Sequence, residues 1–506
     1  MKPSDSLPLP DIHEIDEVNE AKINKAKELN NSALFDVHRW SDYPEVNNPV
    51  NAILEEIKEL RRSKGKRIRE EKKVWRSLKV IILDLWAANK LALNPYRSIS
   101  KNKSDYNKKK ETRYRKIHLT YDYLIPLIND LDKLDYLTQD IGYRKRSNGK
   151  KSKLTRIKAT DKLINKILFP EYGVDRVVAS KGQISIASHH NDNEETIILK
   201  DNKKNRIDYV ETEATKLMRH NLQLINNKIA KERIALEISD EQFKALEKQI
   251  GSEDKPREID FTKIKLHRLF NNSSFEEGGR FYGGWWQNIP REYRKYITIS
   301  YKDSIELDYS GHHFRILYAK ENLNPPDDPY DIDGFEREDL KIALQIILNA
   351  SSKEAAKDAI CKEKISDVAN SDVAKLVKAL EIRHQAINKY YYTGEGIKLQ
   401  YLDSMLAEQV MLKMLKRGAT VLPLHDSFLV LQSYREELEE IMKDEFEKMF
   451  YKSARITLKQ TAIEVEFKEK ERQEELSGIK KYFLTDDFEE LLRVNTHKRY
   501  REIWGS

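Results

Sequence analysis

The sequence has a single cysteine, Cys361, among 506 residues. An intramolecular disulfide is therefore excluded, and a zinc site built on cysteines is disfavoured. No apolar run approaches the roughly 20 residues that span a bilayer, and the acidic N-terminal stretch lacks the apolar segment of a signal peptide. No segment repeats at a fixed period, which argues against a solenoid. We therefore expect a cytoplasmic protein that has no membrane partner.

Charge is abundant but nearly balanced, with 35% charged residues and a net charge of +7. The distribution of charge is then more informative than its sum. Lysines and arginines are interleaved with Tyr106 and Tyr114 in residues 101–118, a mixture typical of nucleic-acid surfaces as well as of solvated ones.

A second basic stretch surrounds Asn148-Gly149, a dipeptide typical of hairpin turns. A helix is predicted to begin near Tyr121 and to precede this hairpin, and the pair resembles a winged-helix element. In such an element Arg144, Arg146 and Lys151 would contact phosphates of DNA. An ordinary surface hairpin is the alternative.

The stretch SIELDYSGHHFRILYA, residues 304–319, predicts a strand followed by a helix. In the strand, Ile305 and Leu307 would face the core, while Glu306 and Asp308 would share the other side. The spacing becomes helical after Gly311. An aspartate at this position either caps the helix or binds a metal ion.

A second aspartate comes from VLPLHDSFLVLQS, residues 421–433. Two apolar runs flank His425-Asp426-Ser427, so the segment predicts a hairpin that presents Asp426 at its apex. Two carboxylates from separate strands suffice to bridge two Mg²⁺ ions, the metal arrangement that nucleotidyl transfer uses.

A cationic helix face follows from REDLKIALQIILNA, residues 337–350. Arg337, Lys341, Gln345 and Asn349 recur every four residues and would therefore lie on one side of the helix. Cations on such a face can neutralise a triphosphate as pyrophosphate leaves.

Together these stretches, with GGRFYGGWWQNIPR (residues 278–291), resemble the palm and fingers of family A DNA polymerases and of the related phage-type single-subunit RNA polymerases. The resemblance covers residues 275–432. It implies that Asp308, the Tyr309 carbonyl and Asp426 bind two Mg²⁺ ions, or Mn²⁺, with His425 near the primer end. Arg337 and Lys341 would bind the triphosphate. The residues placed at the primer-template are Arg280, Gln287, Asn288 and Arg315.

The sequence departs from the family at the positions that would select the sugar, which are His313, Gln345 and Asn349. His313 stands where the DNA polymerases usually have a glutamate that excludes a ribose 2′-OH. Asn349 stands where an aromatic residue is usual, and Ser427 follows Asp426 as in the RNA polymerases. We expect DNA synthesis on a primer-template from nucleoside triphosphates, with an RNA polymerase or primase as the alternative.

Several neighbouring residues have open roles. Glu306 is a third metal ligand, an acid partner, or a solvent-bridged carboxylate of the strand. Asp403 and Ser404 are expected to make structural or template contacts, and Asp328 with Tyr330 to lead into the fingers. No upstream carboxylate cluster indicates a proofreading nuclease. Two other classes stay open: a non-catalytic replication initiator and a metal-dependent nuclease.

The expected fold class is α+β, a right-hand polymerase with an antiparallel palm, helical fingers and thumb, and a helical, winged-helix-like N-terminal region. Replication or repair of a mobile element is a hypothesis from this architecture. The expected divisions are a polar arm (1–50), a nucleic-acid-binding region (51–170), a thumb-like region (171–270), the palm and fingers (271–465) and a helical extension (466–506).

Overall fold

The structure is a computed structural model, and it describes residues 29–37, 39–41, 46–91, 94–106, 113–115, 119–143, 153–168, 195–251, 259–363 and 370–459. The chain divides into two units, Met1–Thr457 and Leu458–Ser506. The expected extension at 466–506 lies outside the described residues. In the described part, no helix combines the length and the apolarity that a membrane span requires.

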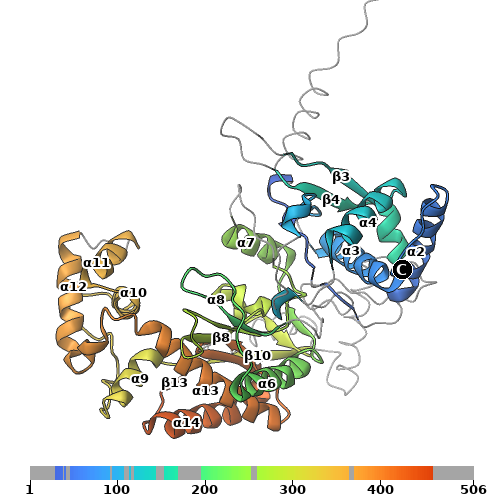
Figure 1. The fold of residues 1–506 in the computed structure, drawn as a ribbon. Helices are drawn as coiled ribbons and strands as arrows, with labels where there is room; N and C mark the ends of the chain where they lie inside the picture. The colour runs from blue at the N-terminus through green and yellow to red at the C-terminus, as the bar shows by residue number, and fades with distance from the viewer. Residues whose placement is uncertain are drawn as a thin grey trace, which may run out of the picture. The chain divides into compact units, whose positions relative to one another are not determined.

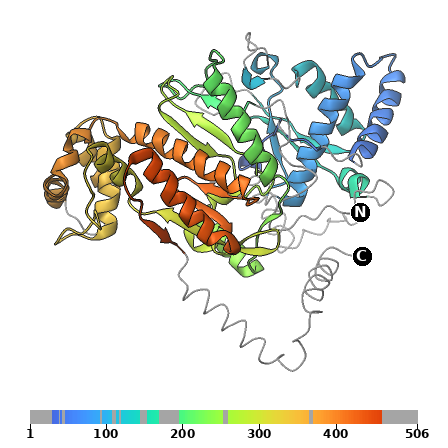
Figure 2. The same cartoon turned by 90° about the horizontal axis from the view of Figure 1, so that it is seen from below.

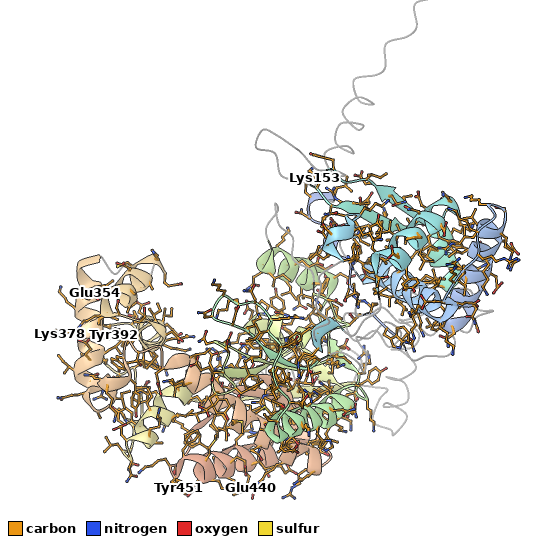
Figure 3. All side chains as sticks on the ribbon, viewed as in Figure 1. Lys153, Glu354, Lys378, Tyr392, Glu440 and Tyr451 are labelled. Carbon is orange, nitrogen blue, oxygen red and sulfur yellow. The ribbon has the colours of Figure 1, made fainter. Side chains whose placement is uncertain are left out.

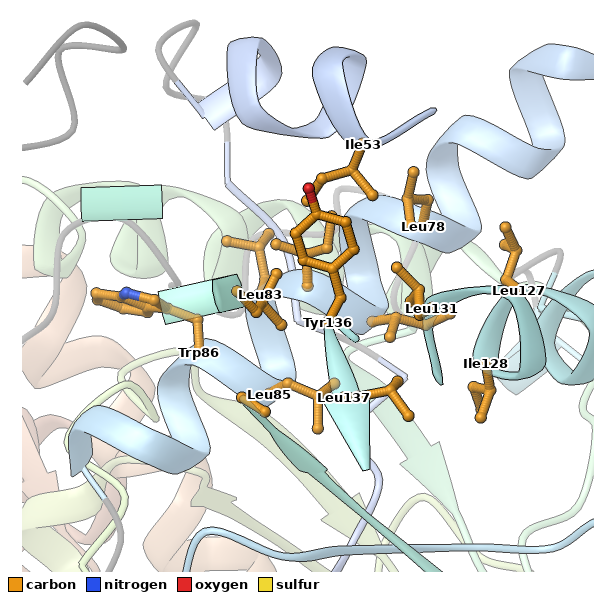
Figure 4. Close-up of a cluster of buried hydrophobic side chains, with 14 of the residues drawn as sticks. Ile53, Leu78, Leu83, Leu85, Trp86, Leu127, Ile128, Leu131, Tyr136 and Leu137 are labelled. Carbon is orange, nitrogen blue, oxygen red and sulfur yellow. The ribbon is translucent and has the colours of Figure 1, made fainter. Parts of the chain in front are cut away.

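The N-terminal region is built on helices α2 (Asn47–Arg62), α3 (Glu71–Leu91), α4 (Tyr121–Lys133) and α5 (Asp161–Leu168). Apolar residues at helical spacing give each a buried face, as Val50, Ile53 and Ile57 do in α2. Side chains from all four helices and from strands of the small sheet meet in one apolar core, whose members include Leu78, Leu131 and Tyr136 (Figure 4).

A small sheet completes this region, with strand order β1-β2-β4-β3. Its strands are β1 (Ala33–Leu34), β2 (Arg97–Ile99), β3 (Leu137–Asp140) and β4 (Thr155–Ala159). β4 pairs antiparallel with both β2 and β3. The predicted hairpin is therefore present as β3 and β4, directly after α4. β1 and the start of α2 fall inside residues 1–50, where the sequence predicts a polar arm.

A six-stranded sheet forms the centre of the remaining chain, in the order β11-β12-β10-β9-β6, with β13 (Ile456–Leu458) beside β10. The strands are β6 (Ile234–Leu236), β9 (Ile297–Ile299), β10 (Lys302–Tyr309), β11 (Leu422–Leu424) and β12 (Ser427–Leu431). The pairings along the main path are antiparallel. Helices α6 (Glu213–Ile229), α13 (Gly396–Lys416) and α14 (Arg435–Phe450) lie along one side of this sheet (Figures 1 and 2).

A three-stranded sheet lies against α13 and has the order β5-β7-β8. Its strands are β5 (Ile197–Leu199), β7 (His267–Phe270) and β8 (Gly278–Tyr282). At Gly279, φ is +79° and a Cβ atom would come within 2.8 Å of the Ser404 hydroxyl on α13. Glycine therefore permits the close approach of β8 to this helix.

A helical group comprises α9 (His312–Lys320), α10 (Arg337–Asn349), α11 (Lys353–Lys362) and α12 (Asn370–Arg383) (Figure 1). Tyr392, labelled in Figure 3, donates from its hydroxyl to Glu381 Oε1 at 2.9 Å and so holds the loop after α12 onto that helix. Shorter helices are α7 (Asp240–Ile250) and α8 (Arg291–Arg294), and the 3₁₀ helices are Lys103–Asp105, Arg113–Arg115, Trp285–Asn288, Gln385–Tyr390 and Gln432–Tyr434.

Two details differ from the sequence expectations. The charged pattern of residues 210–238 predicts one helix, but α6 ends at Ile229 and residues 234–236 form β6, which is buried and pairs with β9. The expected boundary at 270/271 runs through both sheets, because β7 pairs with β8 and β6 pairs with β9, and both partners lie beyond the boundary. Residues 195–270 therefore belong to the same packed unit as the proposed palm.

Candidate active site

Asp308 on β10 and Asp426 in the turn between β11 and β12 lie at one end of the six-stranded sheet. Asp308 is opposite Ser427 in the pairing of β10 with β12. The Tyr309 amide donates to the Asp426 carbonyl at 3.2 Å, which fixes the register beyond that pair. Asp308 is 9% exposed and Asp426 is half-buried. Two carboxylates separated by more than a hundred residues in sequence are thus brought to one strand end.

The hairpin that carries Asp426 is tight, since Leu424 is opposite Ser427 with two residues between them. His425 takes up the reversal with a φ of +69°, in the left-handed region that non-glycine residues seldom occupy. The apex predicted from the sequence is therefore present, and it consists of His425 and Asp426.

The polar row of β10 is buried together with its apolar row, whereas the sequence predicted that only the apolar row faces the core. Glu306 is 3% exposed. It accepts a hydrogen bond from the Ser427 hydroxyl at 2.7 Å and from Arg294 Nη1 at 3.3 Å. A buried carboxylate requires such partners. These contacts give Glu306 a structural role. They differ from those expected of a metal ligand that faces open space or of a carboxylate bridged by solvent.

Arg280, on β8, is held near Asp426 by Asp403 of α13. Its Nε donates to Asp403 Oδ2 at 2.6 Å, and its Nη2 lies 3.2 Å from His313 Nε2. Burial alone would raise the pKa of Asp403, but Arg280 and His312 hold that pKa well below its ordinary value. Arg280 thus stays charged next to the candidate site, where Asp403 and Asp426 both raise its pKa against the effect of burial.

Two histidines at the start of α9 extend this network. His312 stacks on Tyr309 with ring centroids 4.8 Å apart, and its Nε2 lies 3.3 Å from Asp403 Oδ1. Burial, with help from Arg280, lowers the pKa of His313 to about 4. His313 is therefore neutral near pH 7, and its Nε2 can accept from Arg280. His313 therefore belongs to a chain of polar side chains with Arg280 and Asp403.

His425 lies beside Tyr282, with ring centroids 5.4 Å apart. Burial and Arg280 lower the pKa of His425, so this ring is also neutral near pH 7. Its Nδ1 atom is buried and has no hydrogen-bond partner within the described residues.

Gln287 and Trp286 brace the strand that leads to His425. Both side chains donate to the Pro423 carbonyl, Gln287 Nε2 at 3.0 Å and Trp286 Nε1 at 3.1 Å. Asn288 is exposed. The amide of Gln287 therefore contacts the hairpin, where the sequence placed it near a primer.

α10 presents the predicted face to solvent. Arg337, Lys341, Gln345 and Asn349 are exposed, while most apolar residues of α10 are buried, namely Leu340, Ala343, Leu344, Ile347 and Leu348. Arg337 is 50% exposed and Lys341 47%. Arg337 Nε donates to Asp328 Oδ2 at 2.9 Å, and Lys341 Nζ lies 3.4 Å from Glu338. The spacing correctly predicted the face but not its acidic partners.

Arg315 is tied to the main chain at the end of β10, where its Nε donates to the Ser310 carbonyl at 2.9 Å. The remaining cations predicted to bind DNA, Arg144, Arg146 and Lys151, lie outside the described residues. Lys153 (Figure 3), at the base of the hairpin, is exposed and donates from its main-chain amide to the Tyr143 carbonyl at 2.9 Å.

Sequence reasoning expected structural or template contacts from Asp403 and Ser404, but it missed Arg268 of β7 and Glu408 of α13, which form a buried ion pair. Arg268 donates to Glu408 Oε2 at 2.9 Å and to the hydroxyl of Ser404, the residue after Asp403, also at 2.9 Å. The available signal was the presence of Asp403, Ser404 and Glu408 among the apolar residues of the buried face of α13.

The oxygen ligands available at this site suit Mg²⁺, but they do not form a complete set of protein ligands around an ion. Within the described ranges, no three His, Cys, Asp or Glu side chains form a metal-binding group. Asp308 and Asp426 offer two carboxylates, and Mg²⁺ commonly takes one or two together with several waters. When bound between such carboxylates, the ions supply activation of the attacking hydroxyl and charge neutralisation of the phosphates.

Comparison with known proteins gives little further guidance. No protein-family model and no curated protein matches the chain. Among solved structures, the POL domain of Pol1 from M. smegmatis, in complex with DNA primer-template and dNTP, is similar over 43% of this chain with 11% identity and a TM-score of 0.25. The match spans about half of that chain, 49%. A likeness at this TM-score does not define a fold.

Proposed function

We propose that this protein is a template-directed nucleotidyltransferase that extends a primer using two Mg²⁺ ions, with DNA as the product. The observation that carries the proposal is the pairing of Asp308 with the Asp426 hairpin at one strand end. The catalytic side chains would be these two aspartates, with His425 at the primer end.

The exposed face of α10 supports the same reaction. A triphosphate carries several negative charges, and Arg337 and Lys341 offer charge-assisted hydrogen bonds to it. A nuclease would need the two aspartates but not this cationic face. In the free protein both cations contact acidic residues, which are exposed enough for a phosphate to displace them.

The choice of sugar depends on His313 and on Ser427. Ser427 favours the RNA polymerase alternative by resemblance, because a glutamate follows the aspartate in the DNA polymerases. Here the Ser427 hydroxyl donates to the Glu306 carboxylate at 2.7 Å. Glu306 of β10 therefore provides a carboxylate next to the hairpin, although the hairpin itself has a serine after Asp426. This contact weakens the case against DNA synthesis.

The N-terminal region would bind DNA through the β3–β4 hairpin. α4 is unsuited to a groove of DNA, because Asp122 and Asp132 are exposed on it. Backbone contacts from the hairpin cations Arg144, Arg146 and Lys151 are then the proposed source of affinity.

The test is incubation of the purified chain with a primed DNA template, Mg²⁺ and labelled nucleotides, in separate deoxy- and ribonucleotide arms. Extension with deoxynucleotides is the predicted outcome. Extension with ribonucleotides alone would assign an RNA polymerase or primase. Shortening of the primer would indicate a nuclease, and no change would favour a non-catalytic initiator.

A further inference from the structure

Two arginines from distant segments converge on one main-chain oxygen beside the end of β10. Arg455 Nη1 donates to the Asp327 carbonyl at 2.9 Å, and Arg315 Nη2 donates to the same oxygen at 3.4 Å. In the part of the chain that the structure describes, neither guanidinium forms an ion pair with a carboxylate. Two like charges are thus brought together on a neutral atom, an arrangement that favours an added anion.

The electrostatics agree with this geometry. Burial lowers the pKa of Arg315 most, and the nearby charge of Arg455 lowers it further. Asp327 raises this pKa and offsets the two effects only in part. The adjacent carboxylate, Asp328, accepts a hydrogen bond from Arg337. The side chain of Asp327 is exposed to solvent. The cationic charge of Arg315 and Arg455 is therefore incompletely compensated.

Both arginines are fixed next to the candidate active site through Ser310, which is two residues beyond Asp308. The Ser310 amide donates to the Arg455 carbonyl at 2.9 Å, and Arg315 Nε donates to the Ser310 carbonyl at 2.9 Å. Arg455 itself is exposed and follows the end of α14, which Tyr451 marks in Figure 3. An anion held by these arginines would lie close to the two aspartates.

We propose that Arg315 and Arg455 form a polyphosphate site, which receives the outer phosphates of a nucleoside triphosphate and the pyrophosphate that is released. This inference rests on the proposed function and adds Arg455 to its machinery. Planar guanidinium groups match phosphate oxygens with paired hydrogen bonds. Arg337, bonded to the neighbouring Asp328, would contribute from the start of α10.

The experiment measures binding of inorganic pyrophosphate to the full chain by titration calorimetry, in EDTA so that metal ions do not contribute. The variants are Arg455→Gln, Arg315→Gln and Arg455→Lys. The control is Arg435→Gln, an exposed arginine at the opposite end of the 16-residue helix α14, about 24 Å away along its axis. We expect roughly tenfold weaker binding for each Gln variant, because a charge-assisted hydrogen bond to the phosphate is removed. Arg455→Lys should fall between wild type and Arg455→Gln, and Arg435→Gln should bind as wild type does.

Thermal unfolding of each variant shows whether it folds, and Arg455→Lys carries the test if Arg455→Gln does not. Unchanged pyrophosphate binding in the folded Arg455 variants would overturn the proposal, as would no binding by the wild type. A second arm titrates a short DNA duplex, and an equal loss there would assign the arginines to the nucleic-acid backbone instead. Primer extension without a pyrophosphate site refutes this inference alone, whereas a pyrophosphate site without extension refutes the proposed function alone.

Discussion

Buried charges surround the two candidate catalytic aspartates. Asp403, 2% exposed, lies between Arg280 and His312, and it keeps the arginine directed toward the Asp426 hairpin. A buried carboxylate and guanidinium are stable only as a pair, because either one alone would be an uncompensated charge in a poorly solvated place. Asp403 is therefore a positioning residue.

Asp403→Asn should destabilise the fold by about 3–5 kcal/mol at pH 7, because Arg280 loses its partner. The folded-state pKa of Asp403 is depressed, so its contribution is present above the ordinary aspartate value near 4 and is lost as the pH falls below it. Urea unfolding at pH 7 and at about pH 3 measures this. The difference in the free energy of unfolding between wild type and Asp403→Asn should be smaller at the lower pH. The exposed Asp444→Asn should leave the unfolding curve unchanged at both pH values. Equal differences at both pH values would contradict the assignment.

His313→Ala should admit ribonucleotides while reducing deoxynucleotide incorporation only modestly. The ring accepts from Arg280 and stands at the position that the resemblance assigns to the incoming sugar. Removing it takes away the group that a 2′-OH would clash with or leave unsatisfied. The measurement is the ratio of kcat/KM for matched deoxy- and ribonucleotides, with the exposed His220→Ala as the control. An unchanged ratio would exclude His313 from sugar selection.

Among the elements, β10 with α9 and the exposed face of α10 were predictable from local patterns. Alternation from Ser304 to Tyr309 and spacing of four from Arg337 to Asn349 are properties of a single segment. β6 was missed because Ile234–Leu236 follows a charged helix and becomes a strand only by pairing with β9. The Arg280–Asp403 and Arg315–Arg455 arrangements depend on contacts between distant segments, which no local pattern encodes.

The start of α10 is held by an exposed ion pair, and releasing it should favour nucleotide binding. Asp328→Asn removes the charge that engages Arg337 but keeps the oxygen that accepts from the Tyr330 amide. Because an exposed pair contributes about 1 kcal/mol or less, we expect KM for the nucleotide to fall by a factor of about two to five. Steady-state extension kinetics measure the change, and Asp331→Asn, in the same loop, is the matched control. A raised KM would mean that Asp328 orders the binding site.

At the scale of the whole molecule, the six-stranded sheet gathers strands from residues 234 to 458. A fragment beginning near Asp260 would therefore lack β6 and α6, which belong to the sheet and its covering layer. A fragment intended to retain extension should begin before Glu195. The sequence located the two aspartates but not this boundary, since β5 and β6 are short and their partners are distant.

The basic hairpin should supply salt-dependent DNA affinity. Reversing the charge of Arg144, Arg146 and Lys151 to glutamate should weaken binding and reduce the slope of log K against log salt by roughly 0.9 for each phosphate that is no longer neutralised. Binding isotherms at several salt concentrations measure the slope. Reversal of the exposed Arg435 and Lys443 on α14 is the control. An unchanged slope in the hairpin variant would remove the DNA-binding role.

The central claim is that Asp308 and Asp426 jointly perform nucleotidyl transfer, and single-turnover primer extension by Asp308→Asn and Asp426→Asn tests it most directly. Each substitution removes a charge with little change in shape, so each should abolish nearly all incorporation, a loss of several kcal/mol of transition-state stabilisation. DNA affinity should stay within a few-fold of wild type, and Asp444→Asn should extend normally. Near-normal incorporation by either catalytic variant, in a protein that extends primers, would contradict the account.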